Sequence, residues 1–285
     1  MPYSHKKEHL NMKRFLKITI LIIVTIFLAQ SVSGYDPSKH QKNKNGKSGG
    51  EGHHSYGRHK GPPADIPAHI KERTSPDGKG INLNNSQIGV KGMAIMAKTP
   101  ELKNIVSMAL KGNKLGDEGV RIMTQSSNFK NLEFLSLWDN GISSSGVKML
   151  ARGANFNNLK ELNLMKNNIG DDAVILLVDS SNLSHLTSLD LSVNKISDKG
   201  ALAIATSPYL SNLKSLDLFN NQISPKGLKA ILQSKTLTNL EKLDVVKNKI
   251  DDESAAKLWK SHADSCRALR ESGNPDKGSL PICPS

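Results

Sequence analysis

Two patterns of apolar residues alternate along the chain from about residue 80. In the stretch LTSLDLSVNKISDKGALAIA (186–205), Leu189 and Leu191 alternate with polar residues, and this period of two predicts a short strand with one buried face. Further along the same stretch, Ala201 and Ile204 lie three residues apart, which predicts a helix with one buried face. The segment therefore predicts a strand followed by a helix.

The same pattern recurs every 27 residues. An asparagine marks its register in six copies, and a serine takes that place in the first copy: Ser86, Asn113, Asn140, Asn167, Asn194, Asn221 and Asn248. About seven copies at constant spacing predict a solenoid in which neighbouring repeats bury one another. Because each marker follows a strand where the chain turns, we expect its amide to bind backbone groups of neighbouring turns.

Residues that favour helix starts precede the second half of several repeats. Ser143, Ser197, Ser224 and Asp251 occupy equivalent places, and Pro225 follows one of them. Serine and aspartate are common N-caps, and proline is favoured at the first helical position. We therefore expect a helix to begin directly after each of these caps.

The copies match the pattern L-x-x-L-x-L-x-x-N-x-L, so the chain resembles leucine-rich-repeat proteins over about residues 80–260. The long second half of each repeat resembles the ribonuclease-inhibitor subtype, with a glycine six places after the marker in most copies: Gly92, Gly119, Gly146, Gly200 and Gly227. The resemblance implies an α/β horseshoe with parallel strands on its concave face, helices on its convex face, and binding of other proteins. Ala173 and Ser254 replace the glycine, and the repeats lack the cysteines of the mammalian inhibitors, so inhibition of a ribonuclease is not implied.

The N-terminal residues 1–34 have the layout of a secretory signal peptide. A basic start after Met12, which is a possible true start, leads into an apolar run, and the small residues Ser31 and Ser33 follow it. The run is shorter than the roughly 20 residues that a membrane span needs. We expect export with cleavage and no transmembrane segment afterwards. An uncleaved signal anchor is the alternative.

Residues 35–79 are expected to form a disordered basic linker, because few apolar side chains offset the cost of ordering it. The linker contains His40, His53, His54, His59 and His69. A histidine-rich tract can bind metal ions, but without carboxylate partners at ligand spacing we expect only weak, adventitious binding and no dedicated metal site or cofactor.

The formal charge of +13 is spread along the chain, with +4 in residues 1–34, +4 in the linker and +5 in the remainder. Basic residues of this remainder are mixed with twenty acidic ones. Nucleic-acid-binding proteins usually gather their basic residues on one face, so no specific nucleic-acid site is expected.

Two cysteines follow the last repeat, Cys266 and Cys283. In an exported chain such a pair favours a disulfide bond, which would contribute about 3 kcal/mol by restricting the unfolded chain. We interpret residues 261–285 as a C-terminal cap over the end of the solenoid. The alternative is two free thiols in a reducing compartment.

The strand positions that face away from the core differ from repeat to repeat. Five carry large apolar side chains and are expected to form a protein-binding surface: Phe134, Trp138, Met165, Phe219 and Val246. Tryptophan is among the residues most enriched at binding hot spots. The alternative is that each side chain lies against its neighbours on the sheet and shields them.

Three consecutive repeats place aspartates at one such position, Asp190, Asp217 and Asp244. Carboxylates at strand spacing repel one another, which is expected to raise the pKa of at least one of them unless a cation lies opposite. This row favours a basic partner. Aspartate is, however, common at this place in leucine-rich repeats, so a solvated row without function is the alternative.

The sequence contains none of the common catalytic signatures. His185 and His262 are interpreted as surface residues. We therefore expect a monomeric, non-enzymatic protein that is exported to a bacterial periplasm or cell surface, or is secreted, and that binds a protein or peptide through its concave face. The alternatives are an inhibitor or activator of a partner enzyme, and a structural surface component held by the basic linker.

Overall fold

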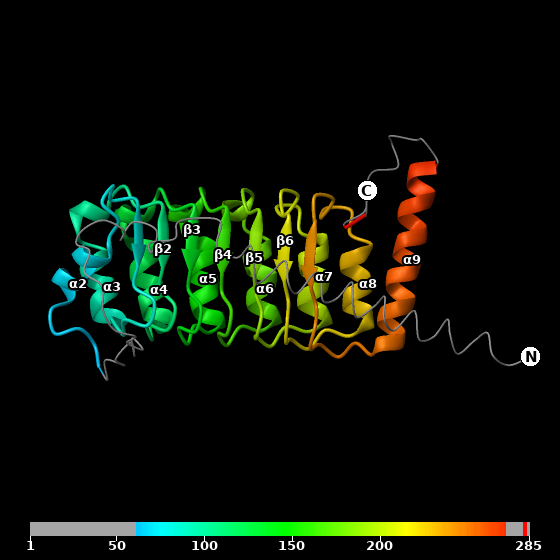
Figure 1. Cartoon of the computed structure of the whole chain (residues 1–285), viewed down its shortest axis with the longest axis horizontal. Coiled ribbons are helices and arrows are strands. Elements are labelled where there is room, and N and C mark those ends of the chain that lie inside the picture. Colours follow the sequence, from blue (N-terminus) through cyan, green and yellow to red (C-terminus); the bar gives the residue numbers. More distant parts are fainter. Residues whose placement is uncertain (1–60, 272–281, 284–285) are drawn as a thin grey trace, which may run out of the picture. The chain divides into compact units, whose positions relative to one another are not determined.

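The computed structural model describes residues 61–271 and 282–283. The expected signal peptide, most of the expected linker, and residues 272–281 of the expected cap lie outside the described residues. Seven short strands form one parallel sheet in chain order (Figure 1): β1 (Gly80–Asn82), β2 (Ser107–Ala109), β3 (Phe134–Ser136), β4 (Glu161–Asn163), β5 (Ser188–Asp190), β6 (Ser215–Asp217) and β7 (Lys242–Asp244).

Every strand residue pairs with the residue 27 positions later, so that Leu189 lies beside Leu216 and Asp190 beside Asp217. The middle residue of each strand is buried beneath the sheet. This register follows from the constant repeat length, because a one-residue slip would turn the buried leucines to the other face.

A helix follows each strand, and these helices line one side of the sheet in a row (Figure 1). They are α3 (Gly89–Met96), α4 (Gly116–Gln125), α5 (Ser144–Arg152), α6 (Asp171–Val178), α7 (Asp198–Thr206), α8 (Pro225–Leu232) and α9 (Asp252–Glu271). Short 3₁₀ turns lead back to the sheet: η2 (Pro100–Leu102), η3 (Ser127–Phe129), η4 (Ala154–Phe156) and η5 (Ser181–Leu183). Apolar residues of both layers form one continuous core, and the α/β solenoid predicted from the repeats is confirmed.

The predicted helix caps are present. Ser143, Ser197 and Ser224 each accept a hydrogen bond from the backbone N–H two residues later. Asp251 accepts one from the N–H of Ser254 at 2.8 Å. The expected turn-binding role of the asparagine markers is also confirmed, because the side chain of Asn113 binds backbone groups of its own repeat and of the preceding one.

A carboxylate from the preceding repeat supports three of these caps, which the sequence analysis did not anticipate. The Oδ1 and Oδ2 atoms of Asp171 accept hydrogen bonds from the N–H and the hydroxyl of Ser197 at 2.8 and 2.5 Å. Asp171 also accepts the N–H of Gly200 at 3.0 Å. The same arrangement joins Asp198 to Ser224, and Asp117 to Ser143.

These contacts explain three of the five glycines that lie six places after the marker, Gly146, Gly200 and Gly227. A Cβ atom on Gly200 would lie 2.7 Å from Oδ1 of Asp171, which is 29 residues earlier. Where Ala173 and Ser254 replace the glycine, the residue 29 positions earlier is Ser144 or Pro225 and not aspartate. The two departures from the glycine pattern therefore occur where no carboxylate needs the space.

The residue before each marker turns the chain in the left-handed conformation in seven consecutive repeats, at Asn85, Gly112, Asp139, Lys166, Val193, Asn220 and Lys247. Val193 has φ 53°, which is costly for a β-branched side chain.

We expect Val193→Asn to raise the free energy of unfolding by about 1 kcal/mol, measured by urea denaturation. Asn220→Val is the matched control and should lower it by a similar amount. Equal stabilities for each variant and the parent would contradict the assigned strain.

The ordered solenoid begins earlier than expected, because part of the expected linker forms helix α2 (Ile66–Arg73). Asp65 caps this helix by accepting the N–H of Ala68 at 2.9 Å. Ile70 is buried in the core beside the first repeat. The expectation of disorder is therefore wrong for residues 66–73. It rested on the low apolar content of the segment, whereas the burial of Ile70 against the first repeat stabilises this helix.

The C-terminal helix α9 continues from the last repeat through the boundary expected near residue 260. Cys266 on this helix forms a disulfide with Cys283, with their Cα atoms 5.6 Å apart. The N–H of Ile282 donates to the carbonyl of Leu240 at 2.8 Å. These links hold residues 282–283 against the last repeat. Among the described residues, no helix is long and apolar enough to cross a membrane.

Candidate protein-binding face

Helices cover one side of the sheet, and no helix of the described residues covers the other side, which we call the strand face. It consists of three columns of side chains, at positions six, four and two before each marker. The columns are Gly80, Ser107, Phe134, Glu161, Ser188, Ser215 and Lys242; Asn82, Ala109, Ser136, Asn163, Asp190, Asp217 and Asp244; and Asn84, Lys111, Trp138, Met165, Ser192, Phe219 and Val246. All eight residues proposed from the sequence for binding therefore lie on this one face.

Trp138 is half-buried on the strand face rather than projecting from it. The ammonium of Lys111, one repeat earlier, lies 3.2 Å from the centroid of its ring. The indole Nε1 atom is buried and has no hydrogen-bond partner within the described residues. Strand neighbours are about 4.8 Å apart, which allows the long lysine side chain to extend over the ring beside it.

Phe219 has a similar cover, because the ammonium of Lys247 lies 5.1 Å from the centroid of its ring. Phe134 and Met165 are also half-buried, and only Val246 of the five apolar residues is exposed, at 39%. Such contacts between a cation and an aromatic ring contribute about 0.5–1 kcal/mol at a surface. Trp138 and Phe219 thus lie against neighbouring side chains, as the alternative interpretation held, and each has a lysine ammonium over its ring.

The three aspartates lie side by side in the sheet, as their register predicted. Asp217 accepts the N–H of Phe219 at 2.9 Å, and Asp244 accepts the N–H of Val246 at 2.8 Å. Asn163, at the same position one repeat before the row, accepts the N–H of Met165 at 2.9 Å. The side chain four places before the marker therefore stabilises the turn that follows the strand, and both asparagine and aspartate can accept this hydrogen bond.

Asp190 has further partners in its own neighbourhood. Its carboxylate accepts the amide of Asn163 at 2.7 Å and the hydroxyl of Ser192 at 2.6 Å. Burial nevertheless raises the pKa of Asp190, with the hydrogen bonds from Ser192 and Asn163 opposing it. The effect of burial exceeds that of these hydrogen bonds, so the pKa of Asp190 lies above its ordinary value.

Burial also raises the pKa of Asp217, to about 7, and the negative charges of Asp190 and then Asp244 add to the effect. The pKa of Asp244 is raised by burial. The sequence correctly predicted a raised pKa in this row. The main cause is the loss of water around the carboxylates, however, and not the repulsion on which that prediction rested.

Lys111, which lies in the same column as Trp138, was not among the binding residues expected from the sequence. Also not expected was the ion pair between Lys166 and Asp139, whose charged atoms are 2.8 Å apart at the margin of the strand face. Both contacts join residues 27 positions apart. Reading each column for opposite charges and for cation–ring pairs in adjacent repeats would have found them.

Comparison with known proteins supports the repeat assignment. The family model described as "Leucine Rich repeat" matches residues 130–151, 157–178, 182–205, 209–232 and 236–258. No curated protein matches the chain. These five segments are similar to leucine-rich repeats, and the ribonuclease-inhibitor subtype is not confirmed.

Two solved structures illustrate the similarity. A leucine-rich-repeat protein of Leptospira interrogans is 26% identical over 56% of this chain, with a TM-score of 0.37. The match spans 36% of that protein's chain. Internalin C2 of Listeria monocytogenes is 22% identical over 63% of this chain and 76% of its own, with a TM-score of 0.41.

Proposed function

We propose that this chain is an exported, non-enzymatic protein that binds a protein or peptide partner through the strand face, because five of its segments match the leucine-rich-repeat family model. Solenoid repeats commonly present such extended surfaces to partners. The binding residues would be Phe134, Trp138, Met165, Phe219 and Val246 together with Asp190, Asp217 and Asp244. The chain would act as a monomer without a cofactor.

The row of three carboxylates is the observation that carries this proposal. Burial and mutual repulsion raise the pKa of Asp217 to about 7. A lysine or arginine from a partner, placed over the row, would favour the ionised carboxylates and form charge-assisted hydrogen bonds with them. The strand face therefore favours a partner with a basic segment.

Trp138 and Phe219 lie in the same column of the strand face, three repeats apart. Their rings would provide apolar contacts at two points along the sheet, on either side of Asp190. Aromatic side chains dominate the energy of many interfaces because they bury a large apolar area with few rotatable bonds. An extended peptide that crosses the strands could contact both rings and the carboxylate row.

Export is supported by the composition of residues 12–34, which lie outside the described part of the chain. N-terminal sequencing of the protein recovered from the cell exterior or envelope tests this step. A mature N-terminus shortly after Ser31 or Ser33 is expected. Recovery of the chain with an intact leader would favour the signal anchor instead.

The binding site is tested by a double substitution, Trp138→Ala with Phe219→Ala. After a partner has been identified by affinity capture with the mature chain, we expect the double variant to bind it at least about 30-fold more weakly, a loss of about 2 kcal/mol. Isothermal titration calorimetry measures the affinity, and circular dichroism confirms the fold of each variant.

Leu202→Ala is the matched control, because Leu202 is a large apolar residue on α7 with 52% of its surface exposed. It lies on the helix layer and not on the strand face. Its replacement should leave the affinity unchanged. A double variant that binds as tightly as the parent would show that the strand face is not the binding site.

A further inference from the structure

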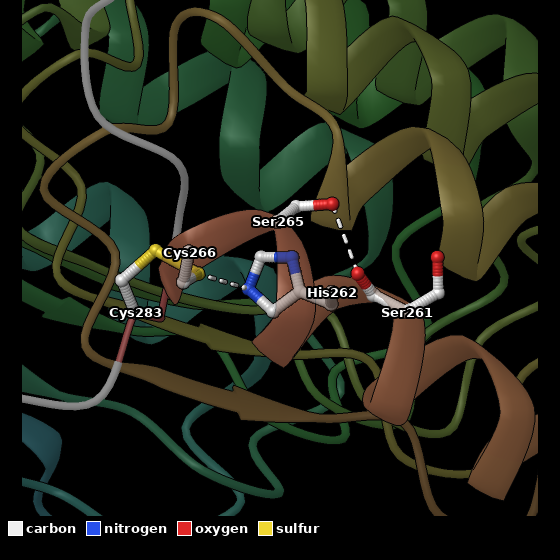
Figure 2. The surroundings of a disulfide bond; sticks show 5 residues. All are labelled: Ser261, His262, Ser265, Cys266 and Cys283. Carbon is white, nitrogen blue, oxygen red and sulfur yellow. Dashed lines mark hydrogen bonds between the residues drawn. A yellow bond between two sulfur atoms is a disulfide. The ribbon is translucent and has the colours of Figure 1, made fainter. Parts of the chain in front are cut away.

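Three potential metal ligands meet near the C-terminal end of the solenoid. His262 and Cys266 lie four residues apart on α9 and therefore share one face of that helix. Cys283 joins them through the disulfide. The Nε2 atom of His262 is 3.5 Å from Sγ of Cys266, and the donor atoms of all three residues lie within 4.8 Å of one another (Figure 2).

Two of the three side chains are shielded from water. His262 is 6% exposed and Cys266 is 1% exposed, so the interpretation of His262 as a surface residue is wrong, while Cys283 is half-buried. The ring of Trp259 meets the imidazole edge-on, with the centroids 6.1 Å apart. Figure 2 shows the imidazole directed at the sulfur of Cys266. A buried imidazole held in one orientation beside sulfur loses little conformational freedom when it binds a metal ion.

The spacing of these donors suits a tetrahedral ion. Zinc binds thiolate sulfur at about 2.3 Å and imidazole nitrogen at about 2.0–2.1 Å, so that neighbouring donors in a tetrahedral site lie about 3.5–3.8 Å apart. The distance from His262 to Cys266 already meets this requirement. The cysteine Cα atoms, 5.6 Å apart, leave room for the two sulfurs to separate by rotation of their side chains once the bond between them is broken.

We propose that reduction of the disulfide converts this cluster into a Zn²⁺ site, with Cys266, Cys283 and His262 as ligands and a water or other donor in the fourth position. A dithiol reductant supplies two electrons and two protons, which break the S–S bond and give two thiols, and it becomes a disulfide itself. Zn²⁺ then displaces both thiol protons. Two thiolates and a neutral imidazole balance the charge of the ion.

The site gives the C-terminal segment two ways of remaining attached to α9. Under oxidising conditions the disulfide links positions 266 and 283. Under reducing conditions the metal ion bridges the same two sulfurs. The link between α9 and residues 282–283 would therefore persist whether the chain is in an oxidising or a reducing compartment.

Co²⁺ provides the test, because thiolate ligands give it a characteristic charge-transfer absorption and tetrahedral coordination gives it intense visible bands. The full chain, reduced with a phosphine under anaerobic conditions, should bind one Co²⁺ with both features and exchange it for Zn²⁺. The oxidised chain should show no thiolate absorption. His262→Ala should weaken Co²⁺ binding at least about tenfold, and Cys283→Ser should remove about half of the thiolate absorption, since it removes one of two sulfur ligands.

His185→Ala is the matched control, because His185 is exposed and lies outside the cluster, and it should leave the absorption unchanged. Metal ions held by His40, His53, His54 and His59 would give no thiolate absorption, so the two kinds of site are distinguishable. If reduction alone lowers the circular dichroism signal, Zn²⁺ should restore it. A reduced chain without thiolate absorption, or a His262→Ala variant that binds as tightly as the parent, would overturn the proposal.

Discussion

Replacement of Asn167 by alanine lowers the free energy of unfolding by about 3 kcal/mol, whereas the same change at the neighbouring Asn168 alters it by less than about 0.5 kcal/mol. Both residues are asparagines in the same turn, so their intrinsic conformational preferences are alike. Asn168 is exposed, while Asn167 is partly buried and lies in the marker column.

The expected loss follows from the backbone groups that Asn167 serves. Its Oδ1 atom accepts the N–H groups of Asn140 and Ile142 at 3.2 and 3.0 Å. Its Nδ2 atom donates to the carbonyls of Leu137 and Leu164 at 3.1 and 3.0 Å. Alanine removes these four bonds at once, together with a fifth from Nδ2 to the carbonyl of Met165 at 3.3 Å. A buried backbone group left without a partner costs about 1–3 kcal/mol, and partial access of water to this turn keeps the total loss below the sum over all these groups, at about 3 kcal/mol.

Urea denaturation followed by circular dichroism measures both variants. Because each repeat contacts only its neighbours, the loss at Asn167 should weaken the interfaces with the repeats on either side and broaden the transition. Equal stabilities of the two variants would mean that water replaces the amide without cost, and the marker column would then have no structural role.

The repeat length made most of the fold predictable. A constant spacing of 27 residues fixes which strand residues are neighbours, so the pairing of Asp190 with Asp217 followed from counting. The marker amides were predictable for the same reason, because a turn repeated in register presents the same unpaired groups each time.

Contacts between the second halves of adjacent repeats were not predictable from the pattern. The carboxylate of Asp171 supports the cap at Ser197, 26 residues later, and no periodic apolar signal marks such a pair. A second row of amides, Asn128, Asn155 and Asn182, donates to carbonyls of the preceding repeat. These bonds depend on the path of the returning chain, which the sequence does not specify locally.

The candidate site was predictable in position but not in environment. Counting back from the markers placed Trp138 and the aspartates on one face. Whether a side chain on that face is covered depends on its neighbours one repeat away, such as Lys111 over Trp138. For this reason the burial that governs the pKa of Asp217 became visible only in the structure.

We expect that raising the pH from about 4 to about 7 destabilises this protein through Asp217 and that Asp217→Asn removes this effect. The carboxyl has its ordinary pKa of 3.8 in the unfolded chain and a pKa of about 7 in the folded one. Between these values the unfolded chain releases the proton while the folded chain keeps it. The contribution of Asp217 is therefore fully present below pH 3.8 and is lost as the pH rises to about 7, a change of about 3–4 kcal/mol.

Asparagine suits this position, because Asn82 and Asn163 occupy it in other repeats and accept the same turn N–H. The Asp217→Asn variant should therefore keep the hydrogen bond from Phe219 without carrying a charge. We expect it to match the parent near pH 4 and to exceed it by about 3–4 kcal/mol above pH 7. Urea denaturation of both proteins at a series of pH values measures the difference.

Asp172→Asn is the control, because Asp172 is an exposed carboxylate whose pKa is lowered by its hydrogen bond with Lys199. Its pH profile should lack the rise that Asp217→Asn shows.

The way in which the difference in free energy of unfolding between Asp217→Asn and the parent changes with pH also bears on function. An advantage of the variant that grows up to pH 7 and then levels off indicates a carboxyl that is buried beside the like charges of Asp190 and Asp244. An advantage that is constant with pH would contradict the raised pKa.

If a basic partner binds over the row, its charge should lower the pKa of Asp217 and abolish the pH dependence in the complex. The affinity should then rise with pH through the same window, because binding favours the ionised carboxylate.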